Sequence, residues 1–154
     1  MMDAAHFMRE SEPLLTPLYR IAYSLLHSRA DAEDAVQQGL LKAWAAREKA
    51  RPESFRPWVT RIVINESRNI QRYRMRVVPA EAPEPEAAFQ PPNPEIMEAV
   101  YALPEPLRIP FILKYMEHYQ EREVAKAMRL PLSTIKNRLS RARQALRTAL
   151  TEED

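Results

Sequence analysis

The residues best suited to chemistry lie near the C-terminus, where hydroxyl, amide and guanidinium side chains alternate with apolar ones. Apolar residues recur there at three- and four-residue steps, which predicts the buried face of a helix: Ile135, Leu139, Ala142 and Leu146. The opposite face would carry the polar set: Ser133, Thr134, Lys136, Asn137, Arg138, Ser140 and Arg141. Arginine can pair with guanine and asparagine with adenine, while hydroxyls and lysine contact phosphates. This face is therefore a predicted nucleic-acid reader.

The elements before this helix predict a helix-turn-helix. Residues 121–128 read as a short helix whose inward positions are Val124, Ala125 and Met128. Residues 129–132 read as a turn, and Ser133 is expected to cap a helix that runs to about residue 150. Arg129 lies within this turn. Upstream, helices are expected over 95–102 and from 105 to about 119.

A second candidate surface lies on a helix expected from about residue 54 to 74. Its broad apolar side is predicted to be core: Phe55, Trp58, Val59, Ile62, Val63 and Ile70. A narrow stripe beside it interleaves an aromatic ring with arginines and an amide: Trp58, Arg61, Asn65, Arg68 and Arg72. Phosphate contacts plus stacking are how proteins hold unpaired DNA. A row of arginines also fits a solvated face, and both readings stay open on these residues alone.

A third candidate surface lies on a helix that we expect Asp31 to cap and that ends near residue 47. One face should pack inward: Val36, Leu40, Ala43 and Trp44. A second face carries Asp34, Gln37, Gln38 and Leu41, and it is either solvated or a partner surface, with Leu41 favouring a partner. The helix before it carries a continuous apolar stripe, expected to be core: Leu14, Leu15, Leu18, Ile21, Ala22, Leu25 and Leu26. Gly39 inside the helix costs up to about 1 kcal/mol and suggests no function.

Composition predicts an all-α fold, since the 154 residues include one glycine against fourteen prolines. Prolines at 79, 83, 85, 91, 92 and 94 predict an extended linker over 76–94 between two small helical domains, 1–75 and 95–154. Charge is segregated: residues 56–76 hold arginines at 56, 61, 68, 72, 74 and 76 against the single acid Glu66. Residues 129–147 hold basic residues at 129, 136, 138, 141, 143 and 147 and no acid. Two basic helical faces joined by an acidic connector indicate a polyanion partner.

The residue inventory argues against an enzyme. The chain has no cysteine, which excludes disulfides, thiolate nucleophiles and cysteine-bound metals, and a single glycine excludes a phosphate-cradling loop. The three histidines are scattered, and His118 beside Glu121 is better explained as a surface residue than as a metal ligand. We therefore expect no catalytic, cofactor or metal site. The N-terminus lacks a basic and apolar leader and no apolar run could span a bilayer, so we expect a cytoplasmic protein without direct membrane insertion.

With both halves in view, the chain resembles the extracytoplasmic-function (ECF) subgroup of bacterial RNA polymerase sigma factors. The matching residues of the first half are Ala32, Glu33, Asp34, Gln37, Leu40 and Trp44, then Trp58, Arg61, Ile62, Asn65 and Arg72. Those of the second half are Leu103, Pro104, Arg108, Glu123, Val124, Ala125, Pro131, Thr134, Ile135, Lys136, Arg138, Leu139, Arg141 and Ala142. Two independent sets in the right order cover nearly everything but the linker. The family usually has glycine at the turn position of Arg129, so the resemblance implies left-handed backbone there at a cost of roughly 1 kcal/mol or more.

The resemblance implies roles for the three surfaces. The Asp34, Gln37, Gln38 and Leu41 face would dock on the coiled coil of the polymerase beta-prime subunit, and the second domain would contact the beta flap. The Trp58 to Arg72 stripe would open the minus-ten promoter element, with residues 47–56 capturing an unstacked base, and residues 133–141 would read the minus-thirty-five element. Promoter DNA, core RNA polymerase and an anti-sigma factor are the implied partners.

Two other functions remain compatible with the residues. The first is a helix-turn-helix regulator that binds duplex operator DNA independently of polymerase, but that function leaves the stripe from Trp58 to Arg72 unexplained. The second is a helical adaptor that holds polymerase without reading promoters. Loss of DNA-dependent activity on Arg141→Ala would argue against the adaptor.

Overall fold

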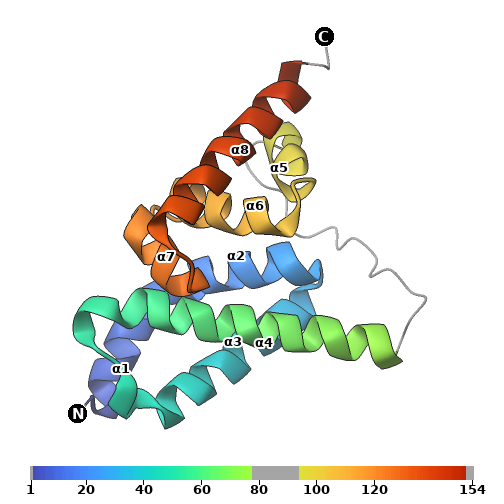
Figure 1. The fold of residues 1–154 in the computed structure, drawn as a ribbon. Helices are drawn as coiled ribbons and strands as arrows, with labels where there is room; N and C mark the ends of the chain where they lie inside the picture. The colour runs from blue at the N-terminus through green and yellow to red at the C-terminus, as the bar shows by residue number, and fades with distance from the viewer. Residues whose placement is uncertain (1, 78–93, 152–154) are drawn as a thin grey trace. The chain divides into compact units, whose positions relative to one another are not determined.

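A computed structural model describes residues 2–77 and 94–151 of the chain (Figure 1). The predicted linker over 76–94 therefore lies almost wholly outside the described residues. Within the described part every regular element is helical, which confirms the all-α class. The chain divides into two compact units, Met1–Pro85 and Glu86–Asp154. None of the described helices is both long and apolar enough to cross a membrane.

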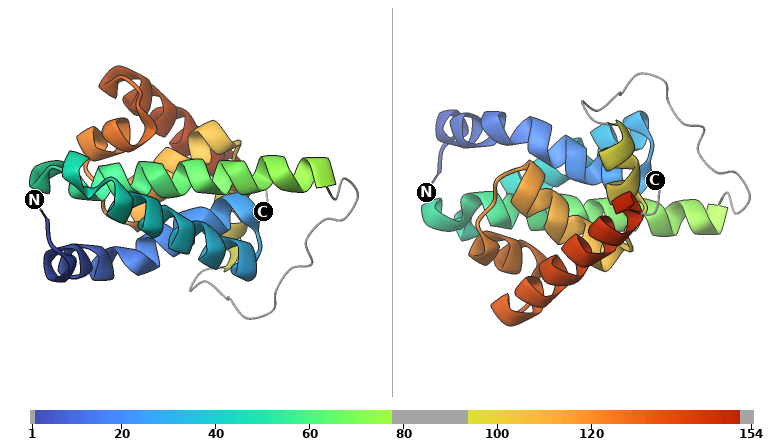
Figure 2. Two further views of the ribbon diagram at one scale, coloured as in Figure 1. Left: turned by 90° about the horizontal axis from the view of Figure 1, so that it is seen from below. Right: turned by 90° about the horizontal axis from the view of Figure 1, so that it is seen from above.

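Unit 1 is built on three long helices that pack on one another: α2 (Leu15–Leu26), α3 (Arg29–Ala45) and α4 (Phe55–Val77) (Figures 1 and 2). A short helix α1 (Ala4–Ser11) and the 3₁₀ turn η1 (Glu12–Leu14) precede α2, and the sequence patterns did not predict α1. Two more 3₁₀ turns, η2 (Arg47–Lys49) and η3 (Pro52–Ser54), connect α3 to α4. The core takes its side chains from the apolar stripes of the three long helices, including Leu18, Ile21, Val59 and Val63, all fully buried.

Two predictions for the start of unit 1 were wrong. Ser28, and not Asp31, caps α3: its Oγ accepts a hydrogen bond from Asp31 N at 3.2 Å, because Ser28 adopts extended backbone and Asp31 is already helical. Asp31 instead forms an ion pair of 3.3 Å with Arg74 at the far end of α4. Leu15 was expected in the core but is 42% exposed, because it begins α2 and lines an open groove instead of the packed interior.

The buried face of α4 also differs from the predicted one in detail. Phe55, Val59 and Val63 are buried as expected, whereas Trp58, Ile62 and Ile70 are only half-buried. Residues that the pattern left outside the core are buried in their place: Pro57, Thr60, Ile64, Glu66 and Ser67. Helix α4 lies against both α2 and α3, so its buried surface is wider and rotated relative to a single apolar stripe.

Gly39 has a packing role in unit 1 that helix propensity alone does not predict. A Cβ placed at Gly39 would lie 2.7 Å from Val63 Cγ2 and 3.3 Å from Val63 Cα. The absence of a side chain thus lets the backbone of α3 approach α4 closely at the centre of the most extensive helix contact of the unit. The position requires glycine for packing, and its backbone φ is not in the left-handed region.

Unit 2 comprises α5 (Pro94–Tyr101), α6 (Glu105–Phe111), the π turn η4 (Ile112–Met116), α7 (Glu121–Met128) and α8 (Leu132–Thr151). The sequence predicted one helix from residue 105 to about 119, but α6 ends at Phe111. Pro110 cannot donate a backbone hydrogen bond inside the helix, and the chain then widens so that Glu117 N reaches Ile112 O at 3.0 Å. The last residues before α7 turn away, with His118 in left-handed backbone.

Arg108 fixes the turn between α5 and α6. Its Nη1 donates to Tyr101 O at 3.0 Å and to Leu103 O at 3.3 Å, which satisfies carbonyls at the end of α5. Burial lowers the pKa of the Arg108 guanidinium, and the neighbouring Glu105 carboxylate opposes that shift. This family-like arginine therefore helps to hold the fold of unit 2.

Candidate nucleic-acid interface

The turn between α7 and α8 reverses at Arg129, the position where the resemblance implied left-handed backbone. This residue is left-handed, with φ 52° and ψ 50°, and the reversal lets Leu130 N reach Ala125 O at 3.0 Å. At the other end of α7, Gln120 forms a capping box with Glu123. Helix α8 begins at Leu132, so Ser133 lies in its first turn and the prediction that it caps the helix was wrong. Pro131 supplies the carbonyl that accepts from Thr134 N at 3.0 Å.

The predicted two-faced character of α8 is confirmed. Its inner face is buried against the unit: Ile135 is 0% exposed, Leu139 1%, Ala142 0% and Leu146 7%. On α7, Val124 is buried as expected, but Ala125 and Met128 are only half-buried, and Ala127 is buried instead.

The predicted reading residues all lie on the first three turns of α8. Ser133, Lys136, Asn137, Ser140 and Arg141 are exposed, and Thr134 and Arg138 are half-buried at the edges. Anchoring one face while exposing the polar one is what a helix needs in order to enter a major groove.

Contacts across the unit add an aromatic residue beside this surface that the sequence analysis missed. Arg143 Nη1 donates to the hydroxyl of Tyr115 at 2.7 Å, and the Tyr115 ring packs on Phe111 with centroids 4.8 Å apart. Lys114 pairs with Glu121 at 2.8 Å, a hydrogen bond that lowers the pKa of the Glu121 carboxyl. No sequence pattern connects positions 28 residues apart, so only the tertiary structure could supply the Tyr115 contact.

The stripe on α4 is continuous because α4 is unbroken from Phe55 to Val77. Its five members are spaced alternately by three and four residues, so they lie on one face: Trp58, Arg61, Asn65, Arg68 and Arg72. Asn65 and Arg72 are exposed, and the other three are half-buried. The Trp58 ring lies 6.1 Å from that of Phe55, and the Arg72 guanidinium donates to Asn69 Oδ1. One side chain of the stripe is thus anchored in the core while others point outward.

The single acidic residue of α4, Glu66, is buried. Glu66 is 8% exposed and forms an ion pair with Lys42 of α3, so its charge is compensated within the unit. Near the end of α4, Gln71 Nε2 donates to Leu25 O at 2.8 Å and Arg74 Nη1 to Leu26 O at 3.0 Å. These two side chains cap the C-terminus of α2. The structure thus separates arginines that hold the fold from those that face outward.

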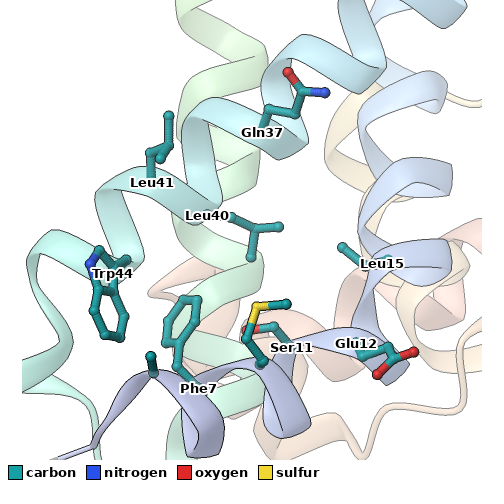
Figure 3. A pocket seen from close by; sticks show the side chains of 10 residues that line it. Phe7, Ser11, Glu12, Leu15, Gln37, Leu40, Leu41 and Trp44 are labelled. Carbon is teal, nitrogen blue, oxygen red and sulfur yellow. The ribbon is translucent and has the colours of Figure 1, made fainter.

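The predicted partner face of α3 is fully outward. Asp34, Gln37, Gln38 and Leu41 are all exposed, with Leu41 at 62%. Two of these residues, Gln37 and Leu41, also line a groove of about 780 Å³ between α1 and α3 (Figure 3). Following α3, Arg47 lies over the Trp44 ring at 3.9 Å and donates to Trp44 O at 3.0 Å, which fixes the start of the segment expected to capture a base.

Within the described residues, no group of three or more His, Cys, Asp or Glu side chains is placed to hold a metal ion.

Comparison with known proteins identifies both units. The model of sigma-70 region 2 matches residues 12–77, and that of sigma-70 region 4 matches residues 94–146. RNA polymerase sigma factor SigV of Bacillus subtilis is 30% identical over 144 residues, covering 88% of this chain and 86% of the relative. ECF RNA polymerase sigma factor SigE of Mycolicibacterium smegmatis is 28% identical over 88% of this chain, which spans 58% of that relative's length.

Solved structures agree with these matches. The sigma factor RpoE of Bartonella quintana, solved with the anti-sigma factor NepR, superimposes with a TM-score of 0.76 at 28% identity, covering 94% of this chain and 96% of that chain. CnrH, solved with the cytosolic domain of CnrY, has the same fold, with a TM-score of 0.74 at 20% identity over 99% of this chain and 92% of that chain. The chain belongs to the ECF subgroup of RNA polymerase sigma factors, the class of proteins that directs transcription initiation.

Proposed function

We propose that this chain binds core RNA polymerase and directs it to a specific set of promoters, with unit 1 opening the minus-ten element and unit 2 reading the minus-thirty-five element. The observation that carries the proposal is α8, whose inner face is buried while Asn137 and Arg141 stand exposed on the other side. Membership of the sigma-factor family is the reason for proposing core RNA polymerase as the partner. In this proposal residues 1–75 form the domain that opens the minus-ten element, residues 76–94 form a linker, and residues 95–154 form the domain that reads the minus-thirty-five element.

The reading role rests on the chemistry of the exposed face. Arg141 and Asn137 are the base-reading residues of the proposal, and the hydroxyls and Lys136 position the phosphates. The seven predicted reading residues, all between Ser133 and Arg141, lie toward the N-terminal end of α8, the end that contacts bases in helix-turn-helix proteins. The second domain would also contact the polymerase beta flap.

The opening role rests on the stripe along α4. Trp58 can stack on an unpaired base, while Arg61, Arg68 and Arg72 lie along the path that a phosphate backbone would follow. Unstacking a base costs a few kcal/mol, so an aromatic surface that replaces the lost stacking favours opening. The internal pairing of Glu66 with Lys42 supports this assignment, since it keeps the one acid of this stretch away from DNA.

Three further assignments follow from the same proposal. Asp34, Gln37, Gln38 and Leu41 would dock on the coiled coil of the beta-prime subunit. An anti-sigma factor would hold the protein inactive, as the complexes of RpoE with NepR and of CnrH with CnrY suggest. Sigma factors in general carry no catalytic activity, so the polymerase would catalyse nucleotide addition. The protein would act together with the polymerase in the cytoplasm.

The first test is assembly with sigma-free core RNA polymerase, measured by size-exclusion chromatography at near-physiological salt. A stoichiometric complex is expected, and a housekeeping sigma factor serves as the positive control. Failure of the folded protein to co-elute, together with tight binding to duplex DNA alone, would replace this proposal by the polymerase-independent regulator.

The second test is run-off transcription from genomic fragments with the reconstituted holoenzyme. Arg141→Ala and Asn137→Ala should each cost about 1–3 kcal/mol of promoter recognition with relaxed sequence choice. Arg147→Ala is the matched control, because Arg147 is an exposed arginine of the same helix farther from its N-terminus. Equal promoter selectivity in all three variants would remove the base-reading role.

The third test addresses promoter opening through permanganate reactivity of unpaired thymines. Trp58→Ala should reduce opening more than closed-complex binding. Tyr73→Ala is the control, because Tyr73 is an aromatic residue of α4 that is 58% exposed and lies off the stripe. Thermal unfolding of both variants separates lost stacking on DNA from lost packing on Phe55, whose ring lies 6.1 Å from that of Trp58.

A further inference from the structure

A basic flank runs along α8 beside the side that carries Asn137 and Arg141. Its members are Lys136, Ser140 and Arg143, which recur at steps of four and three residues and therefore lie on one side of the helix. All three are exposed. This side is about a quarter turn from the buried stripe of α8, so it borders the rest of the unit instead of facing straight outward.

The start of α7 lies close to this flank. Glu121, the first residue of α7, interacts electrostatically with both Lys136 and Arg143. Its carboxylate also accepts a hydrogen bond of 2.8 Å from Lys114 of the π turn η4. Three cations thus lie around one carboxylate, which leaves the flank positive. The first helix of a helix-turn-helix crosses the DNA backbone while the second enters the groove, so we expect this place to face phosphates.

A tyrosine of η4 holds one of these cations. Arg143 Nη1 donates to the hydroxyl of Tyr115 at 2.7 Å. The Tyr115 ring packs on Phe111 with centroids 4.8 Å apart, and Lys114 Nζ lies 5.7 Å from the centroid of the Tyr115 ring. These contacts fix the ring although Tyr115 is 40% exposed. A fixed ring gives the guanidinium of Arg143 an acceptor with a fixed position.

The chemistry of this acceptor suits a DNA contact. A carboxylate would compensate the charge of Arg143, whereas the neutral phenol holds the guanidinium and leaves its charge for an anion. The hydrogen bond engages Nη1, and a guanidinium has further N–H groups that can donate to a phosphate. An arginine that is already held also loses less side-chain freedom on binding than a free one.

We propose that Tyr115 is a positioning residue of the DNA interface, and that Arg143, held by its hydroxyl, contacts a backbone phosphate beside the bases read by Asn137 and Arg141. The inference rests on the proposed function and adds to it a residue of η4, which lies outside the two helices of the helix-turn-helix. Tyr115 acts through Arg143 and reads no base. A backbone contact strengthens binding without changing the choice of sequence.

The deciding experiment locates the phosphate. It uses the holoenzyme, assembled from the full chain and core RNA polymerase, and a promoter fragment obtained by run-off transcription. Neutral methylphosphonates replace single phosphates in and around the minus-thirty-five element, and closed-complex affinity is measured for each. At one linkage the wild type should lose about tenfold and Arg143→Ala less than about twofold, because only the wild type loses a charged hydrogen bond. Matching losses in both proteins at every linkage would overturn the phosphate contact.

A double-mutant cycle tests the role of Tyr115. Tyr115→Phe keeps the ring and its packing on Phe111 and removes only the hydroxyl. It should weaken the closed complex about fivefold in the wild-type chain, and less than about twofold in an Arg143→Ala background, because both residues act through one contact. Tyr101→Phe is the matched control, since it removes a tyrosine hydroxyl from α5 of the same unit. Equal effects of Tyr115→Phe in both backgrounds would overturn the positioning role.

Salt dependence distinguishes positioning from a purely structural role. Arg143→Ala should reduce the slope of log affinity against log salt by about one, and Tyr115→Phe should reduce it by part of that amount. Promoter preference should stay unchanged in both variants, in contrast to Arg141→Ala. A hydroxyl that only joins η4 to α8 would instead lower Tm in Tyr115→Phe and leave the slope unchanged, which would overturn the inference.

The outcomes also separate this inference from the function beneath it. If the wild-type holoenzyme forms no promoter complex, the proposed function fails and the role of Tyr115 fails with it. If the complex forms and the folded variants Tyr115→Phe and Arg143→Ala bind as tightly as the wild type, the function stands and neither residue contributes to the DNA interface.

Discussion

Replacing Gly39 with alanine sets helix propensity against packing, and the structure predicts that packing dominates. Propensity alone favours alanine in a helix by about 1 kcal/mol. The added Cβ would lie 2.7 Å from Val63 Cγ2 and 3.3 Å from Val63 Cα. Val63 is fully buried and a valine in a helix has one strongly preferred χ1 well, so its methyl group cannot rotate aside, and its Cα is backbone.

The expected magnitude follows from these two opposing contributions. Overpacking a well-packed core costs about 1–3 kcal/mol, and contacts with both a rigid methyl group and backbone favour the upper end. Subtracting the propensity gain leaves a net loss of about 2 kcal/mol in the free energy of unfolding of unit 1. For a unit of this size, that corresponds to a fall in Tm of roughly 10 °C.

The assay can report on unit 1 alone. The chain has 2 tryptophans, Trp44 and Trp58, and both lie in this unit, so their fluorescence follows its unfolding in urea. The exposed neighbour Gln38 supplies the control, since the difference between Gln38→Ala and Gln38→Gly measures the propensity gain on the same helix. In a Val63→Ala background, Gly39→Ala should become neutral or stabilising. A rise in stability on Gly39→Ala in the wild-type chain would refute the reasoning.

Three further outcomes are expected. Arg108→Ala should lower the free energy of unfolding of unit 2 by about 2–4 kcal/mol, measured by circular dichroism in denaturant, because it leaves two backbone carbonyls unpaired. Lys114→Met should raise the pKa of Glu121, followed by carboxyl NMR; in the wild type this stabilisation is present above the ordinary carboxyl pKa and is lost as pH falls through the lowered pKa. Its size is small because both side chains are about 30% exposed, and an unmoved pKa would assign the shift to another cause. Ser11→Ala should preserve or raise Tm, because it removes a buried hydroxyl that has no hydrogen-bond partner among the described residues; a fall in Tm would show that the hydroxyl is paired in the folded protein.

The sequence by itself determined which face of each long helix is apolar. A helix repeats every 3.6 residues, so spacing alone identifies the buried stripe of α8 and the outward position of Leu41. These are local properties, and each is encoded within a few residues of the chain.

Tertiary structure decided everything that depends on a second element. The need for glycine at position 39 arises from Val63 on another helix, and the internal role of Glu66 arises from Lys42. Leu15 looked like core because its own helix is apolar, but α1 and α3 leave it at the edge of a groove. Periodicity describes one helix at a time, whereas burial, ion pairing and grooves arise only where two helices meet.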